Sequence, residues 1–233
     1  ASSPVRPADI MKAAGQLHGR EKLEIARLLV AGLKQRQITG SLLDLGPGVG
    51  DVTIPIATLF NQVVVIEKDP ARITRLMQHL SEQGIKEVRA ITGSFFERIA
   101  DVGDQKFNAV VLSHSLFFVP FAQRDAFLRD HVLPLVKDTG TAAIVLNSNV
   151  RQPRNQVELR ATLMRRQDFV PSDRETNLER LIRQWGYPVT VEPLHIVHET
   201  LSRDEIIRLA AAVLSRLDRH EPSIAQYADT HLK

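Results

Sequence analysis

From residue 40 onward, short runs of apolar residues alternate with longer segments of helical periodicity. The runs are rich in valine and isoleucine and lack polar alternation, which is typical of parallel strands buried on both faces. We expect strands at 41–45, 63–67, 88–92, 109–113 and 142–147. We expect helices between them at 50–60, 70–83 and 121–136. This alternation predicts a doubly wound α/β layer.

The two ends of the chain follow a different pattern. Helical periodicity before the first strand predicts helices at 7–17 and 20–37. After Asn149 a polar insertion is expected at 150–172, and then a helix at about 174–185, a late strand within 189–200 and a last helix from the capping box of Ser202 and Glu205. We therefore expect an N-terminal helical extension (1–39) and one domain (40–233) with a mostly parallel sheet of about seven strands and helices on both faces.

Composition narrows the class of protein. The 233 residues include 43% hydrophobic and 24% charged residues, as in an ordinary globular domain, and there is no cysteine. Disulfide scaffolds, thiolate metal sites and cysteine nucleophiles are thereby excluded, and a cytoplasmic location is expected. We expect no membrane span, no secretory signal in residues 1–20 and, because the eight histidines lack ligand spacing, no metal site.

The formal net charge of +3 is too small to indicate a nucleic-acid partner. The positive charge is concentrated between Arg151 and Arg183, a segment that contains eight arginines and five acidic residues. A solvated helix face accounts for such a run more often than phosphate recognition does.

The segment Leu42–Asp51 carries the clearest chemistry. A hydrophobic strand with an acidic residue near its end runs into glycines at alternate positions, Gly46, Gly48 and Gly50. Such a turn lets a ligand approach the backbone and the N–H groups at the start of the next helix. The third glycine of a dinucleotide fingerprint would fall at residue 51, which is aspartate, so that fingerprint is not met.

This segment resembles motif I of the class I S-adenosylmethionine-dependent methyltransferases, through Asp44, Gly46, Pro47, Gly48 and Gly50. The resemblance implies S-adenosylmethionine as cofactor and these residues as its binding loop. The next strand ends in Glu67, followed by Lys68, and the resemblance implies that both residues bind the cofactor. In the family an acid at this place accepts hydrogen bonds from both ribose hydroxyls, which suits an acceptor-only carboxylate. A solvent-exposed glutamate at a strand end is the alternative.

The resemblance extends over about residues 40–147, with departures. Ser94, followed by Phe95, replaces the acid that meets the adenine amino group in the family, and Asn108 replaces an aspartate in the fourth strand. Ser113 at the end of that strand is expected to touch the cofactor. The segment 133–140 resembles the turn before strand five.

The acceptor side of the site is less specified. His114 is the best-placed general base or substrate ligand, with a satisfied pocket-lining histidine as the alternative. Asn147 and Tyr187 are further candidates for contacting substrate, although Asn147 also suits a turn. For three phenylalanines after strand four, core packing is favoured over a substrate wall: Phe117, Phe118 and Phe121.

These observations predict an enzyme that transfers a methyl group directly, in line, to a small-molecule acceptor. An enzyme of the same fold that attacks the aminocarboxypropyl carbon and releases methylthioadenosine is the alternative. An RNA methyltransferase and a non-catalytic cofactor-binding protein are less favoured. The N-terminal helices are expected to cover the cofactor as a lid, against the alternative of a permanently packed helix. The oligomeric state is left open.

Overall fold

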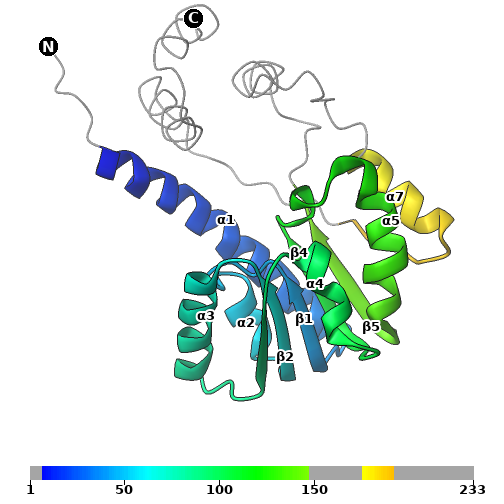
Figure 1. The fold of residues 1–233 in the computed structure, drawn as a ribbon, viewed down its shortest axis with the longest axis horizontal. Helices are drawn as coiled ribbons and strands as arrows, with labels where there is room; N and C mark the ends of the chain where they lie inside the picture. Colours follow the sequence, from blue (N-terminus) through cyan, green and yellow to red (C-terminus); the bar gives the residue numbers. More distant parts are fainter. Residues whose placement is uncertain (1–6, 147–174, 192–233) are drawn as a thin grey trace, which may run out of the picture. The chain divides into compact units, whose positions relative to one another are not determined.

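The computed structural model describes residues 7–146 and 175–191 (Figure 1). The chain divides into two compact units, one of residues 22–147 and 182–189 and the other of 1–21, 148–181 and 190–233. The fold described below is that of the first unit. The expected insertion at 150–172 and the last helix from Ser202 lie outside the described residues, as does the late strand beyond residue 191.

The centre of this unit is a parallel five-stranded sheet in the order β3-β2-β1-β4-β5. The strands are β1 (Gly40–Leu45), β2 (Phe60–Glu67), β3 (Val88–Thr92), β4 (Phe107–Ser113) and β5 (Val136–Val145). The chain moves from β1 outward to β3 and then returns to place β4 against the other side of β1. The expected doubly wound α/β sheet is therefore present with five described strands.

The helical segments connect these strands. The α-helices are α1 (Pro7–Gln35), α2 (Thr53–Ala57), α3 (Pro70–Glu82), α4 (Phe95–Arg98), α5 (Arg124–Phe127) and α7 (Glu175–Gln184). Short 3-10 segments are η1 (Ile99–Val102), η2 (Leu116–Phe118), η3 (Phe121–Gln123) and η5 (Leu133–Leu135), and η4 (Leu128–Val132) is a π-helical turn. None of the helices in the described ranges is long and apolar enough to cross a membrane.

Both faces of the sheet are covered, which explains the lack of polar alternation in its strands. Leu42 and Val63 point to one face, where they share a core with Leu76 and Leu80 of α3. Their neighbours in the strands, Leu43 and Val64 among them, are equally buried although they point to the opposite face. Apolar side chains on both faces are what a sheet with helices on either side requires.

The N-terminal part differs from the expected pair of helices. A single helix, α1, runs through Gly19, because one glycine in a helix interior costs only about 1 kcal/mol and no proline interrupts this segment. From residue 22 on it belongs to the sheet unit, where Leu33 packs into the core and Lys22 pairs with Asp51 after the glycine loop. This half of α1 is a packed helix. The lid expected of residues 1–39 stays a prediction.

Several expected boundaries were wrong. The helix at 50–60 shortens to α2 because β2 begins already at Phe60, and the helix at 121–136 breaks into short turns ending at η5, which holds Pro134. β5 begins at Val136 rather than at residue 142, and it ends at Val145. Within the segment 133–140, where a turn was expected, the pairing of β4 with β5 shifts its register. Phe107 pairs with Val136, whereas Ala109 pairs with Thr141.

A polar cluster joins three strands where they begin. The Oδ1 atom of Asn108 in β4 accepts hydrogen bonds from the Ser41 amide (3.0 Å), the Ser41 hydroxyl (3.1 Å) and the Lys137 ammonium (3.0 Å). Gly40 lies so close that a Cβ atom there would come within 2.5 Å of the same oxygen. The departure from aspartate at position 108 thus falls in a structural cluster at the amino edge of the sheet.

Candidate functional site

The carboxyl edge of the sheet is the natural place for a ligand. The chain order reverses between β1 and β4, which are neighbours in the sheet but far apart in the sequence (Figure 1). Ligands in open α/β sheets bind at such a switch point, beyond the carboxyl ends of the strands. The glycine loop leaves β1 at this point, with Glu67 ending the strand on one side and Ser113 ending the strand on the other.

The three glycines of the loop have positive φ angles but different surroundings. A Cβ atom on Gly46 would lie 2.9 Å from the Cβ of Ser115, and one on Gly50 would lie 2.5 Å from Leu76. A Cβ atom on Gly48 would meet nothing within 4 Å, although its φ of 63° is left-handed too. Packing therefore explains Gly46 and Gly50, whereas Gly48 leaves its backbone open to a ligand.

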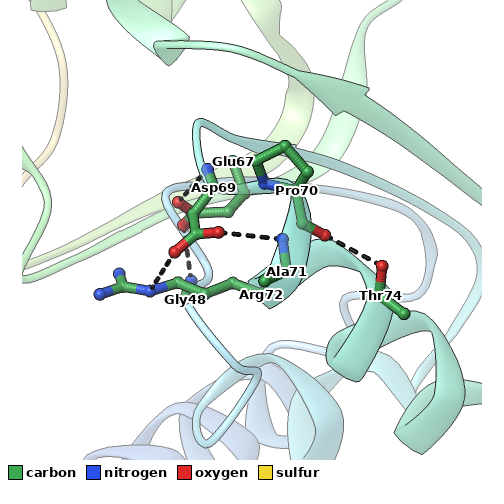
Figure 2. A network of polar contacts seen from close by, with 7 residues as sticks. All are labelled: Gly48, Glu67, Asp69, Pro70, Ala71, Arg72 and Thr74. Atoms are coloured by element: carbon green, nitrogen blue, oxygen red, sulfur yellow. Dashed lines mark hydrogen bonds and ion pairs between the residues drawn. The ribbon is translucent and has the colours of Figure 1, made fainter.

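Glu67 connects the loop to the start of the next helix. Its Oε2 accepts a hydrogen bond from the Gly48 amide (3.0 Å) and its Oε1 accepts one from the Asp69 amide (3.1 Å), as Figure 2 shows. The residue is only 5% exposed, so the alternative of a solvent-exposed glutamate is wrong. Both carboxylate oxygens are held in place by backbone donors at the point where the loop is open.

Asp69 fixes the direction in which α3 leaves this site. Its side chain accepts from the Ala71 amide (2.9 Å) and caps the helix, whose first residue is Pro70 (Figure 2). Aspartate at the cap followed by proline is a strong local signal for a helix start. The chain after Glu67 is thereby turned sharply, which keeps the Asp69 amide within reach of the Glu67 carboxylate.

Asp44 is a buried carboxyl group beneath the glycine loop. Its Oδ2 accepts a hydrogen bond from the Thr53 hydroxyl (2.7 Å), and its Oδ1 has no hydrogen-bond partner. Burial raises the pKa of Asp44 to about 7, an effect that the Thr53 hydroxyl opposes and the nearby charge of Glu67 reinforces. A buried carboxyl with an unused acceptor oxygen is suited to a cationic or hydrogen-bond-donating ligand.

The end of β4 approaches the loop from the other side. After Ser113, the amide of His114 donates to the carbonyl of Val145 in β5 (3.1 Å). The φ angle of His114, 51°, is in the left-handed region. Such a conformation in a non-glycine residue is costly and is often retained at functional sites. The next residue, Ser115, is buried against Gly46, and its hydroxyl has no hydrogen-bond partner.

The segment after β3 also reaches this edge. The amide of Gly93 donates to the carbonyl of Glu67 (3.0 Å), and Ser94 precedes α4 as its cap residue without a side-chain cap bond. The ring of Phe95 is buried, lies beside Gly46 and packs on Phe127 at 5.8 Å between centroids. Of the two expected cofactor residues of this segment, Phe95 therefore adjoins the glycine loop.

Three aromatic side chains beyond β4 contradict the sequence interpretation. Phe117, Phe118 and Phe121 are 55%, 52% and 40% exposed, so the preference for core packing was wrong. Leu116 and Val119 in the same segment fill the core instead. The ammonium of Lys68, the residue after Glu67, lies 4.7 Å from the centre of the Phe118 ring.

The remaining site predictions are not brought together. Asn147 lies outside the described residues. Tyr187 follows α7, its amide donates to the carbonyl of Ile182, and no described hydrogen bond joins it to the strand ends. No cluster of three metal-ligating side chains occurs in the described ranges.

Sequence reasoning missed Thr53 and Ser115. The hydrogen bond from the Thr53 hydroxyl to Asp44 could be inferred only from the fold, because no sequence motif links these two residues. Ser115 stands two residues beyond the end of β4, and its spacing from Ser113 was the only available signal. Tertiary structure brings Thr53 to Asp44 of β1 and Ser115 against Gly46.

Comparison with known proteins agrees with this geometry. Residues 42–140 match the model of a family described as a methyltransferase domain. A ribosomal RNA small subunit methyltransferase A from Desulforapulum autotrophicum is 30% identical over 106 residues, which are 40% of this chain and 36% of that protein. The match thus spans about a third of the length of the curated relative.

Solved structures share the fold at low identity. The precorrin 8w decarboxylase of Methanobacterium thermoautotrophicum has a TM-score of 0.53 and 16% identity over 77% of this chain and 80% of its own. An S-adenosylmethionine-dependent methyltransferase from Clostridium acetobutylicum has a TM-score of 0.45 and 16% identity, over 55% of this chain and 50% of its own. Residues 42–140 therefore match a methyltransferase domain, and the open glycine loop lies within this matched segment.

Proposed function

We propose that this protein transfers a methyl group from S-adenosylmethionine directly, in line, to a small-molecule acceptor at the carboxyl edge of its sheet. The observation that carries the proposal is the pairing of an open backbone at Gly48 with the buried carboxylate of Glu67, 3.0 Å from the Gly48 amide. Gly84 and Gly103 also have open space at a positive φ, but their amides donate to backbone carbonyls and not to a buried carboxylate. The acceptor class is the finer part of the proposal.

The residues at this edge fit S-adenosylmethionine. Gly48 leaves space that a Cβ atom would fill, and Glu67 offers two carboxylate oxygens to ribose hydroxyls. The Oδ1 atom of Asp44 is a buried polar atom without a partner, which suits a hydrogen-bonding group of the cofactor. Ser94, Phe95 and Ser113 would complete the cofactor surface.

The chain's own residues position the reactants rather than activate them strongly. S-adenosylmethionine, when bound, supplies a methyl group on a sulfonium that is already a good leaving group. Glu67 would orient the ribose and the loop at Gly48 would lie against the cofactor backbone. His114, held at the end of β4 by its amide bond to Val145, would take the proton of a hydroxyl or amine acceptor. Fixed orientation of two reactants contributes much of the rate in such transfers.

Mass spectrometry of the purified protein incubated with S-adenosylmethionine alone is the first test. We expect the cofactor to remain intact and S-adenosylhomocysteine to form only when metabolite extracts supply an acceptor. Methylthioadenosine formed faster than in a protein-free control would instead indicate attack on the aminocarboxypropyl carbon. Tight cofactor binding without turnover on any extract would favour a non-catalytic protein.

RNA is the second candidate acceptor, because the curated relative with 30% identity is a ribosomal RNA methyltransferase. The arginines between residues 151 and 183 would be its contact surface. Affinity for RNA that falls steeply with added salt would support this candidate, because phosphate contacts release counterions. No binding at low salt would remove it.

A further inference from the structure

The exposed phenylalanines after β4 form an aromatic surface, defined here as Phe117, Phe118 and Phe121. The rings of Phe117 and Phe118 are neighbours, with 4.4 Å between their centroids. The surface begins four residues after the end of β4, the strand that flanks the switch point of the sheet. Exposing three large rings costs free energy in water, so clustered exposed rings beside a cofactor edge indicate a binding surface.

The side chain of Arg124 stabilises the backbone conformation of this surface. The Nε of Arg124 donates to the carbonyl of Val119 (3.1 Å), and its Nη2 donates to the carbonyl of Phe117 (3.2 Å). The guanidinium also lies 5.3 Å from the centre of the Phe121 ring. A planar, rigid guanidinium that binds two carbonyls fixes the backbone between them. The rings are therefore presented by a pre-organised segment, which lowers the entropy lost when a ligand binds.

Lys68 supplies a positive charge at the same surface. It leaves the end of β2, whereas Phe118 follows β4, and these two strands lie on opposite sides of β1. The Lys68–Phe118 contact thus crosses the edge from which the glycine loop departs. In the described part of the chain no carboxylate forms an ion pair with Lys68. A cation over a ring, with no acidic partner, offers both stacking and charge to a ligand.

We infer that the aromatic surface and Lys68 together bind the acceptor, and that the acceptor is a small planar aromatic carboxylate. This inference rests on the proposed function and specifies its substrate class. The aromatic ring of the acceptor would stack on Phe117 and Phe118, and its carboxylate would pair with Lys68. A single carboxylate matches Lys68, the one ammonium that residues 7–146 and 175–191 place against these rings, because the guanidinium of Arg124 is engaged with two backbone carbonyls. A polyanion would need several such cations.

Three matched compounds separate the two parts of this inference. Binding of 4-hydroxybenzoate, 4-hydroxycyclohexanecarboxylate and 4-hydroxybenzamide is measured by calorimetry on the full chain saturated with S-adenosylhomocysteine. The second compound lacks the aromatic ring and the third lacks the charge. We expect 4-hydroxybenzoate to bind about tenfold more tightly than either, because each loses one of two favourable contacts. Equal affinity for all three would overturn the inference.

Variants then assign the contacts. Phe118→Leu should weaken 4-hydroxybenzoate binding about tenfold. The separate variant Phe118→Tyr should bind it as the unchanged protein does, because tyrosine keeps the ring face. Lys68→Met should abolish the preference for the carboxylate over the amide, whereas Lys106→Met, an exposed lysine before β4, should not. The Phe118 variants should bind S-adenosylhomocysteine as the unchanged protein does.

The proposed function and the acceptor class are contradicted by different outcomes. No binding of S-adenosylhomocysteine to the unchanged protein would contradict the proposed function itself. Normal cofactor binding with an unchanged 4-hydroxybenzoate affinity in Phe118→Leu would contradict only the inference about the acceptor. Salt-sensitive binding of a 20-nucleotide uridine RNA that Phe118→Leu abolishes would also overturn it, and would assign the aromatic surface to RNA.

Discussion

The two edges of the same sheet are built in opposite ways. At the amino edge, one oxygen of Asn108 accepts three hydrogen bonds from Ser41 and Lys137. At the carboxyl edge, Asp44 and Ser115 are both buried and each has a polar oxygen without a partner. Buried polar groups without partners cost free energy, and a stable fold normally avoids them.

We propose that this difference separates structural residues from ligand-binding residues. Saturated polar groups at the beginnings of the strands hold the sheet together, and nothing more is required of them. Unsatisfied groups at the ends of the strands persist where a ligand supplies the missing partner. Replacing residues on each edge should therefore affect different properties, folding stability at one edge and ligand binding at the other.

The largest effect is expected within the glycine loop, from Gly50→Ala. Its Cβ would lie 2.5 Å from Leu76 at a φ of 96°, so unfolding free energy should fall by about 2–5 kcal/mol. The matched change Gly48→Ala meets open space and should cost only about 1–2 kcal/mol. Chemical denaturation measures both.

Cofactor titration completes this pair. The methyl group of Gly48→Ala would occupy the space proposed for the ligand, so affinity for S-adenosylhomocysteine should fall about tenfold or more. Equal loss of stability in the two variants, or full cofactor affinity in Gly48→Ala, would contradict the distinction between packing and open glycines.

The second effect concerns the pH dependence of stability at Asp44. Its folded-state pKa of about 7 lies above the ordinary value of 3.8, so the folded protein holds a proton that the unfolded chain releases. Stability contributed by this group is present at low pH and is lost between about pH 4 and 7. A rise of roughly three pKa units corresponds to up to about 4 kcal/mol.

Asp44→Asn removes this titration, so the variant should gain stability relative to the unchanged protein as the pH rises from 4 to 8. Urea denaturation at several pH values measures the gain. The exposed Asp104→Asn serves as a control and should follow the unchanged protein. A parallel pH profile for Asp44→Asn would show that the carboxyl is ionised in the folded state.

The third effect is on cofactor binding through Glu67. Glu67→Ala should weaken S-adenosylhomocysteine binding by about 1–3 kcal/mol, because the ribose hydroxyls lose a charged acceptor. Asp69→Asn alters the adjacent residue but keeps an oxygen to cap α3, so it should bind nearly normally. Calorimetry decides, and unchanged affinity in Glu67→Ala would remove the ribose role.

The smallest effect is expected at the amino edge, and it is a gain. Asn108→Asp places a full charge where Lys137 and two Ser41 donors already converge, which should stabilise the protein by about 1 kcal/mol. Cofactor affinity should not change. Thermal denaturation tests this, and in a Lys137→Met background most of the gain should disappear. A gain that persists there would assign it to another contact.

The local sequence pattern was sufficient to predict the elements proposed to hold the cofactor. The strand Val88–Thr92 was predicted with its observed bounds, because its apolar run is short and flanked by clear turns. The glycine loop and Glu67 were predicted equally well. Each lies at a strand end, where the residue type indicates the local backbone conformation. Helix 121–136 failed because helical periodicity cannot show where 3-10 and π turns break the hydrogen-bond ladder.

The sequence by itself determined the α/β class, the glycine loop and the acid of the second strand, because strand patterns and turn chemistry depend on residues adjacent in the sequence. Only the tertiary structure decided which glycine is open, why the Asp44 carboxyl holds its proton, and that Phe117 and Phe118 face solvent. These properties depend on atoms brought together from β1, β2 and β4. Burial and electrostatics act through space, and spacing along the chain does not record them.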